Sequence, residues 1–243
     1  MKTITIGHTL TGVVVRKCDL ERIREATAAK YLSEPEPAIA GRLKLRPVCA
    51  TSLHEVNDSP RILTLCRTVT LVGLMGAGKT AIGKRLAARL ELPFIDADDE
   101  IERAAGCTVS EFFERYGEAE FRAGERRVIA RLLEGSPHVL STGGGAYMDA
   151  STRALLRGQA ITVWLRADLD VLFERVKKRA HRPLLRQGDP RDILARLMAQ
   201  RYPIYAEADL VVDSTAQPAE ITTEQVIETL RRHLGAPSAK ATA

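Results

Sequence analysis

Short apolar runs recur along the chain from about residue 67, and segments with apolar residues at helical spacing separate them. A short apolar run between turn residues is typical of a buried strand, whereas apolar residues three or four positions apart form one face of a helix. The expected strands are residues 69–74, 93–95, 139–141, 161–165 and 210–212. Strands that alternate with helices predict an α/β fold whose parallel sheet is covered on both faces.

Helical periodicity and end signals predict helices over residues 110–133, 168–178 and 217–234. We expect Ser110 to cap the first of these, because a side-chain hydroxyl can satisfy the first free amides of a helix. Gly117 and Gly124 are expected to interrupt the same helix, since glycine weakens a helix interior. Asp168 gives the second helix an acidic start.

Residues 1–66 show no period that persists, and Pro35 and Pro37 break whatever precedes them. We expect an irregular, weakly ordered N-terminal extension, or a stretch added by a start codon placed too early in the gene model, rather than a folded accessory domain. Residues 67–234 are the expected folded domain, and residues 235–243 are expected to form a flexible tail.

The composition of the 243-residue chain is that of an ordinary globular protein, with 45% hydrophobic and 28% charged residues. No apolar run reaches the roughly 18 residues that would span a bilayer, so no membrane association is expected. The four cysteines lack the spacing of metal ligands, and no secretory signal is present, which predicts reduced thiols in a cytoplasm.

The net charge of +5 is concentrated in the N-terminal part of the chain. Residues 1–66 hold 10 basic and 7 acidic side chains, which leaves 26 basic and 24 acidic side chains in the remainder. A nucleic-acid partner would require a clustered basic surface, so none is expected. Small anionic ligands explain the basic residues better.

The most specific motif runs from Gly73 to Thr80 and matches the phosphate-binding pattern G-x-x-x-x-G-K-[ST]. Its glycines let successive backbone N–H groups turn toward a polyphosphate, Lys79 reaches the outer phosphates and Thr80 is a ligand of Mg²⁺. An expected strand precedes the motif and an expected helix follows it, so the phosphates would lie at a helix N-terminus. The motif therefore predicts a nucleotide site.

Polar or glycine-rich residues follow the other strands, at the sheet edge where parallel α/β proteins bind ligands. They are Asp96, Asp98 and Asp99 after the second strand, Gly143 to Gly145 after the third and Arg166 after the fourth, with Arg122 and Glu125 on a helix. Any one of these would more often be a solvated surface group. Their placement beside a phosphate-binding loop favours a shared site.

Together these segments resemble the shikimate kinase family over about residues 67–234. The matching blocks are the phosphate loop, Phe94-Ile95-Asp96-Ala97-Asp98 with Ile101-Glu102, Phe121-Arg122 with Glu125, Gly143-Gly144-Gly145, Arg182-Pro183-Leu184-Leu185 and Arg201-x-Pro203-x-Tyr205. The resemblance implies a P-loop NTPase-type three-layer αβα sandwich with a five-stranded parallel sheet, of the nucleoside monophosphate kinase-like kind.

The resemblance also implies an activity: transfer of the γ-phosphoryl group of ATP to the 3-hydroxyl of shikimate, in chorismate and aromatic amino acid biosynthesis. It implies a cytoplasmic enzyme, usually a monomer. By the same match, ATP would be bound by Gly76, Ala77, Gly78, Lys79, Thr80, Ala81, Arg175 and Arg182. Arg182 would belong to a lid that closes on the transferring phosphate, and Thr80 and Asp96 would hold Mg²⁺, the latter directly or through water.

On the acceptor side, the resemblance makes Asp98 the carboxylate that receives the attacking hydroxyl. Arg122 and Arg201 would clamp the carboxylate of shikimate, and Gly144 and Gly145 would let the backbone approach its hydroxyls. Lys79, Asp98 and Arg182 would be the catalytic residues.

Two alternatives share the phosphate loop. A small-molecule kinase such as a gluconate kinase has the same loop but does not need the two arginines together with the glycine triplet. A catalytically silent regulator would bind the nucleotide without phosphoryl transfer, although the intact charged residues oppose this.

Overall fold

The computed structural model describes residues 65–177 and 189–235, so the expected N-terminal extension, the segment around Arg182 and the expected tail lie outside it. At its centre is a five-stranded sheet in which every strand pairs in parallel, in the order β2-β3-β1-β4-β5. The strands are β1 (Thr68–Val72), β2 (Phe94–Asp96), β3 (Val139–Ser141), β4 (Ala160–Arg166) and β5 (Leu210–Asp213). All five expected strands are confirmed, with small shifts at their ends.

The inner strands are apolar because they are covered on both faces. Every residue of β1 and of β3 is buried, and β4 is buried up to its last residue. The edge strand β5 instead alternates buried and exposed positions. This difference is the one expected between a strand enclosed by two helical layers and one with an open side.

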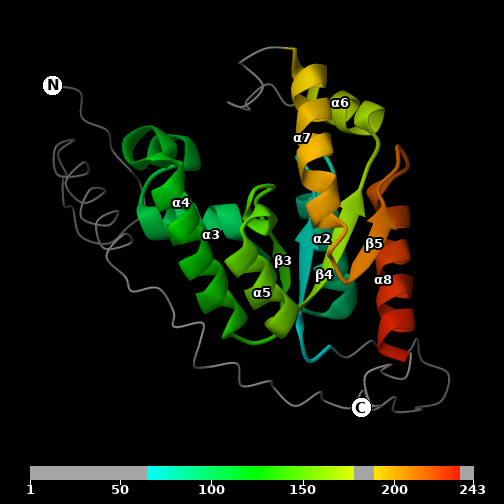
Figure 1. The fold of residues 1–243 in the computed structure, drawn as a ribbon. Coiled ribbons are helices and arrows are strands. Elements are labelled where there is room, and N and C mark those ends of the chain that lie inside the picture. Colours follow the sequence, from blue (N-terminus) through cyan, green and yellow to red (C-terminus); the bar gives the residue numbers. More distant parts are fainter. Residues whose placement is uncertain (1–64, 178–188, 236–243) are drawn as a thin grey trace, which may run out of the picture.

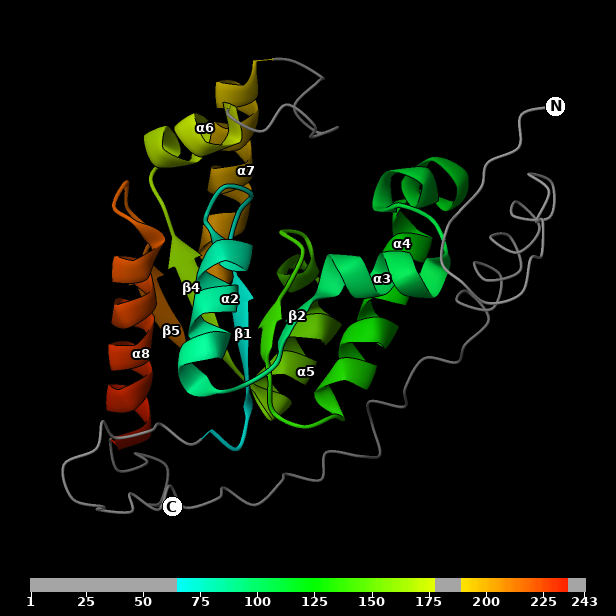
Figure 2. The same ribbon diagram turned by 180° about the vertical axis from the view of Figure 1, so that it is seen from behind.

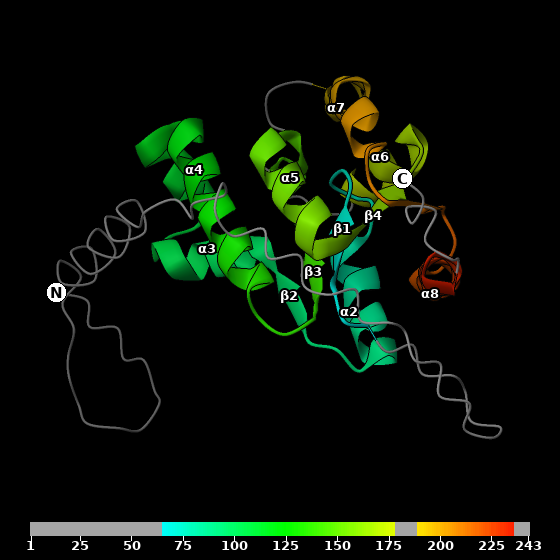
Figure 3. The ribbon, with the colours of Figure 1, turned by 60° about the horizontal axis from the view of Figure 1, so that its bottom comes forward.

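Helices form a layer on each side of the sheet, as Figures 1 and 2 show from opposite directions. The helices α2 (Lys79–Leu90) and α8 (Ala219–Gly235) cover one face. The other face carries α5 (Ala150–Gln159), α7 (Pro190–Tyr205) and the second half of α4 (Val109–Leu133). Figure 3 shows the sheet between these layers, which confirms the three-layer αβα architecture.

A smaller unit stands at the β2 edge, where α3 (Ala97–Ala105) packs against the first half of α4 (Figure 1). Its separate apolar cluster includes Ile101, Phe112 and Phe121. Above the carboxyl end of β4, away from this unit, lie α6 (Leu169–Lys177) and the start of α7 (Figure 1). A short 3₁₀ turn, η1 (Ala146–Met148), follows the glycine triplet.

Two expectations for α4 were wrong in detail. The N-cap is Thr108 rather than Ser110, and it forms a reciprocal capping box with Glu111, which satisfies two free amides where a serine at position 110 would satisfy one. Gly117 does interrupt the helix, with φ 79° and ψ 177°, but Gly124 remains helical. Gly124 is buried, so tertiary packing holds it in the helix despite its low propensity.

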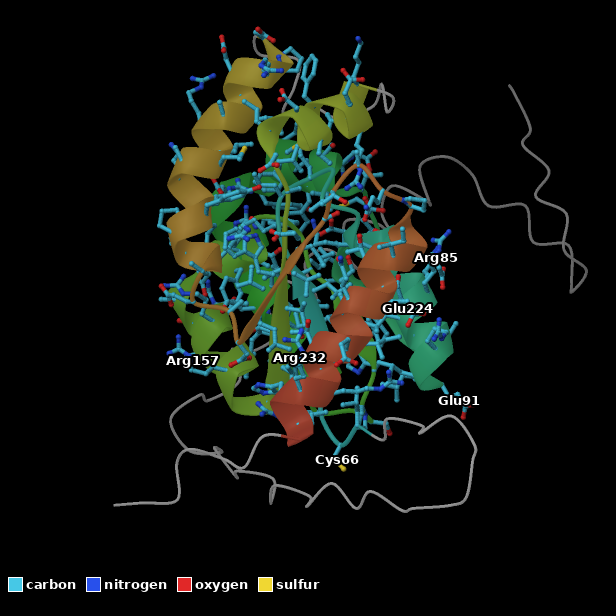
Figure 4. The ribbon with its side chains drawn as sticks, turned by 90° about the vertical axis from the view of Figure 1, so that its right-hand side faces the viewer. Cys66, Arg85, Glu91, Arg157, Glu224 and Arg232 are labelled. Atoms are coloured by element: carbon cyan, nitrogen blue, oxygen red, sulfur yellow. The ribbon has the colours of Figure 1, made fainter. Side chains whose placement is uncertain are left out.

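The outer surfaces of α2 and α8 are joined by exposed ion pairs. Arg85 and Arg89 both contact Glu220, at 3.3 and 3.5 Å, and Arg89 also pairs with Glu224. Figure 4 shows Arg85 and Glu224 on this side of the molecule. Such exposed pairs add little stability, so the apolar contacts beneath them hold the layer together.

None of the helices within residues 65–177 and 189–235 combines the length and the hydropathy that a bilayer crossing requires.

Candidate active site

The phosphate-binding motif forms a tight loop between β1 and α2. Gly73, Gly76 and Gly78 have φ values of 145°, 86° and 93°, which side chains rarely tolerate. Space is limiting too, because a Cβ on Gly76 would lie 2.9 Å from Val176 Cγ2. The loop therefore needs glycine at these positions both for its backbone angles and for its packing.

Lys79 begins α2 and folds back over the loop. Its Nζ donates to the carbonyls of Gly73 at 2.9 Å and Leu74 at 3.1 Å. A positive charge thus lies above a turn of backbone amides at a helix N-terminus, an arrangement that suits a polyphosphate.

Thr80, in the first turn of α2, lies beside Asp96 at the end of β2. The Thr80 hydroxyl donates to the Asp96 carboxylate at 3.1 Å, and Asp96 also caps α3 by accepting from the backbone N–H of Asp98. In the part of the chain that the structure describes, no cluster of three or more His, Cys, Asp or Glu side chains could hold a metal ion. The Thr80–Asp96 pair still fits Mg²⁺, which uses few protein oxygens and completes its shell with phosphates and water.

Two carboxylates from different elements converge on Gly143. A Cβ at this position would lie 2.8 Å from Asp98 Oδ1 on α3 and 3.2 Å from Glu125 Oε1 on α4. Glu125 is buried, and its Oε1 has no hydrogen-bond partner among the described residues. Gly143 thus holds open the space in which both acids meet.

Arg122 lies against the last glycine of the triplet, Gly145. A Cβ on Gly145 would come within 2.3 Å of its Nη2. The guanidinium donates to Glu125 at 2.7 Å and to the exposed Glu118 at 3.3 Å, and it lies 5.2 Å from the ring centre of Phe121. Residues of α4 therefore hold the Arg122 guanidinium in place, and one side of it faces the glycine triplet.

Arg201 contacts the middle glycine from the opposite direction. Its Nη1 donates to the Gly144 carbonyl at 2.8 Å, and a Cβ on Gly144 would lie 3.3 Å from the same nitrogen. The hydroxyl of Tyr205, one turn further along α7, also donates to this carbonyl. Gly144 in addition approaches the carbonyl of Gly73, so it lies where the phosphate loop meets the arginines.

Each residue of the triplet thus faces a different charged side chain. Gly143 faces the two acids, Gly144 faces Arg201 and Gly145 faces Arg122. These contacts bring together side chains of α3, α4 and α7, which are far apart in the sequence. The result is a small site with two guanidinium groups and two carboxyl groups, next to a phosphate-binding loop.

Burial of the Arg122–Glu125 pair and the contact between its two members determine their protonation states. Burial raises the pKa of Glu125 to about 7, and the opposing effect of Arg122 only partly offsets this. Burial alone would lower the pKa of Arg122, but Glu125 and Glu118 raise it above its ordinary value. The guanidinium therefore stays charged, while Glu125 can change its protonation near neutral pH.

The Asp98 side chain opens to solvent, yet the surrounding protein still desolvates it. This desolvation, followed by the charge of Asp96, raises the pKa of Asp98, and Lys79 partly offsets the effect. A raised pKa makes the carboxylate a stronger base, which suits a group that accepts a proton from a hydroxyl.

The shikimate kinase family model matches residues 75–231. The chain belongs to this family. The shikimate kinase of Paramagnetospirillum magneticum is 58% identical over 168 residues, covering 69% of this chain and 86% of the relative. That of Mesorhizobium japonicum is 54% identical over 176 residues, covering 72% of this chain and 87% of the relative.

Solved structures agree with the family. The shikimate kinase from Acinetobacter baumannii in complex with shikimate has a TM-score of 0.66 at 34% identity, covering 69% of this chain and 94% of that one. The enzyme from Bacteroides thetaiotaomicron has a TM-score of 0.65 at 33% identity, covering 68% and 98%. The chain is an ATP-dependent shikimate kinase of aromatic amino acid biosynthesis, and these relationships support this over a gluconate kinase or a silent regulator.

Most of the site residues expected from the sequence lie at the carboxyl edge of the sheet, and their roles stay predictions. Arg182 lies outside the described residues, so its place in the site stays a prediction. Arg166 ends β4 but pairs with Asp213 at 2.6 Å on β5. It belongs to the sheet edge rather than to the glycine triplet.

Two polar residues on the nucleotide side, Ser214 and Thr215, were not expected from the sequence, and both contact Arg175, which the resemblance assigns to ATP. Arg175 donates to the Gly76 carbonyl at 3.2 Å, to the Ser214 hydroxyl at 2.9 Å and to the Thr215 carbonyl. Ser214 in turn donates to the carbonyl of Ala77 at 2.8 Å. Ser214 and Thr215 directly follow β5, so the rule that singled out the residues after the other strands could have found them.

Proposed function

We propose that this shikimate kinase acts through the residues gathered at the glycine triplet and the phosphate loop. The observation that carries the proposal is the convergence of Asp98, Arg122 and Arg201 on three consecutive glycines. Shikimate is a small ring with one carboxylate and three hydroxyls, so its site needs cationic groups, a hydroxyl acceptor and backbone donors close together.

Arg122 and Arg201 bind the shikimate carboxylate. A planar guanidinium offers two parallel N–H donors to a carboxylate, which a lysine cannot do. Gly144 and Gly145 present backbone amides to the ring hydroxyls, and the lack of a Cβ lets the ring approach. Glu125 orients Arg122 through the 2.7 Å bond between them.

Lys79 and the amides of residues 76–81 bind the β- and γ-phosphates of ATP. Thr80 and Asp96 hold Mg²⁺, supported by their oxygen chemistry and their 3.1 Å separation. When bound, this ion neutralises charge on the phosphate oxygens. Arg175 lies beside the adenine, and Arg182 closes over the transferring phosphate and helps exclude water.

Asp98 accepts the proton of the 3-hydroxyl as the hydroxyl oxygen attacks the γ-phosphorus. The bond from that phosphorus to the β–γ bridging oxygen breaks, and ADP leaves with the bond's electron pair. The transition state is loose, so positioning and charge neutralisation supply most of the catalysis. The raised pKa of the Asp98 carboxyl supports its role as the proton acceptor.

We further propose that the enzyme works as a monomer in the cytoplasm, without nucleic-acid or membrane partners. The balanced charge of residues 67–243 supports the absence of a nucleic-acid surface.

Release of ADP after addition of shikimate tests the function. Quinate and gluconate serve as controls, because quinate differs in its hydroxyl pattern and gluconate is the acceptor of the alternative kinase. We expect rapid ADP release with shikimate and only background release with the other two. Equal rates with gluconate, or ATP binding without any product, would reject the proposal.

A further inference from the structure

The carbonyl of Gly144 accepts two hydrogen bonds from the same helix. Arg201 Nη1 donates at 2.8 Å, and the hydroxyl of Tyr205 is the second donor. Arg201 lies one turn before Tyr205, which is the final residue of α7. One side of the glycine triplet is therefore fastened to α7 through a single oxygen.

The ring of Tyr205 is rigidly placed. The residue is fully buried, and its ring centre lies 6.2, 6.1 and 6.3 Å from those of Tyr147, Trp164 and Tyr202. Burial also raises the pKa of Tyr205, although Arg201 opposes this. The phenol thus remains protonated and acts as a fixed hydrogen-bond donor.

The position of the Gly144 carbonyl determines the direction of the next amide. A trans peptide is planar, and its C=O and N–H point in opposite directions. Holding the Gly144 carbonyl toward α7 therefore directs the N–H of Gly145 away from α7. A peptide between two glycines has no Cβ to restrict its rotation, so this direction needs an external restraint.

Substrate binding affects the two donors, Arg201 and Tyr205, differently. If Arg201 binds the shikimate carboxylate, as the proposed function requires, its five N–H donors are divided between the substrate and the Gly144 carbonyl. The Tyr205 hydroxyl has no such second task.

We propose that Tyr205 is a positioning residue whose hydroxyl holds the Gly144–Gly145 peptide, so that the Gly145 N–H faces bound shikimate and donates to it. The role rests on the proposed function. It makes the acceptor site depend on a buried tyrosine that itself touches neither substrate.

Tyr202 provides a matched control. Its hydroxyl also donates to a backbone carbonyl, that of Ala167, and its ring packs against Trp164 with 4.9 Å between ring centres. Ala167 follows β4 rather than β3. Tyr202→Phe therefore removes the same atom from the same helix and aromatic group without releasing Gly144.

The test compares Tyr205→Phe, Tyr202→Phe and the wild-type protein by steady-state kinetics and thermal unfolding. Loss of one neutral hydrogen bond predicts that Tyr205→Phe raises the KM for shikimate by roughly 3- to 10-fold. The KM for ATP should not change, and the Tm should match that of Tyr202→Phe. Tyr202→Phe should leave both KM values at the wild-type level.

The proposal is overturned if Tyr205→Phe retains the wild-type KM for shikimate, if both KM values rise together, or if Tyr202→Phe has the same effect. A Tyr205→Phe protein that fails to fold would also overturn it, since the hydroxyl would then serve the fold rather than the substrate. Failure of the proposed function looks different. In that case the wild-type protein itself releases no ADP with shikimate, and the role of Tyr205 falls with it.

Discussion

The nucleotide side and the acceptor side of this site are built in opposite ways. The phosphate loop is one continuous segment, Gly73 to Thr80, whose glycines adopt positive φ angles and whose lysine bonds to carbonyls of the same loop. The acceptor side takes side chains from α3, α4 and α7 and directs them at a separate glycine triplet.

The glycines on the two sides also serve different purposes. Gly76 and Gly78 need backbone angles that other residues avoid. Gly145 has an ordinary φ of −97°, but a Cβ there would overlap the guanidinium of Arg122. A phosphate site can therefore be encoded locally, whereas the shikimate site exists only after the fold brings distant side chains together.

Asp98→Asn should separate the two sides most strongly. The substitution keeps the shape but removes the base, so we expect kcat to fall by roughly 10²- to 10⁴-fold. The KM for ATP should change little, because the phosphate loop is untouched. Steady-state kinetics with both substrates measures this.

Asp99→Asn is the control, since Asp99 is an exposed neighbour on the same turn. An equal loss of kcat in both variants would show that the charge of the turn, rather than Asp98 itself, matters.

Glu125→Gln tests the electrostatics of the acceptor side. The pKa of Glu125 is raised from its ordinary value of 4.5 to about 7 in the folded protein. The folded state therefore binds this proton more tightly than the unfolded chain. The resulting stabilisation is fully present below pH 4.5 and is lost as the pH rises through about 7. The free energy of unfolding of the wild type, relative to the variant, should fall by about 3 kcal/mol over this range.

Urea unfolding of the substrate-free proteins between about pH 4.5 and pH 8 gives this difference. Subtracting the variant removes the contribution of the other titrating groups. If the free energies of unfolding of the wild type and of Glu125→Gln changed with pH in parallel, the raised pKa of Glu125 would be contradicted.

Gly145→Ala tests the role of space in the triplet. The new Cβ would displace Arg122, so the KM for shikimate should rise by roughly 10- to 100-fold while the KM for ATP stays the same. Gly235→Ala is the control, because nothing lies within 4 Å of a Cβ at that position. A rise in both KM values would mean that the triplet supports the phosphate loop as well.

Glu118→Gln should have the smallest effect, and in the opposite direction. Glu118 is exposed and bonds Arg122 at 3.3 Å, so it competes with the substrate carboxylate. Removing an exposed pair of this kind should lower the KM for shikimate by about two-fold. Glu120→Gln removes the same charge at an exposed position two residues from Arg122, a spacing at which helix side chains do not face each other, and it should leave the KM unchanged.

The contrast between the two sides explains what the sequence could predict. The strands and the phosphate loop follow from local patterns, because burial on both faces and positive φ angles each leave a direct signal. Arg122 and Arg201 could be assigned only through the family resemblance. Nothing within either segment indicates that both reach the same triplet.

The misses have two causes: a local capping pattern decides the start of α4, and tertiary contacts decide the other two. Ser110 has the right chemistry for a cap, but the capping box with Glu111 favours Thr108. Gly124 resembles a helix breaker, yet it is buried and helical. Tyr205 belongs to a matching block without any assigned role, since its contact with Gly144 depends on how α7 packs against the triplet.

A structure of the enzyme with shikimate and ADP tests the central claim most directly. We predict that the carboxylate of shikimate lies within hydrogen-bond distance of both Arg122 and Arg201, and that one ring hydroxyl contacts Asp98. A carboxylate bound elsewhere, with the two arginines still on Glu125 and Gly144 alone, would contradict the account.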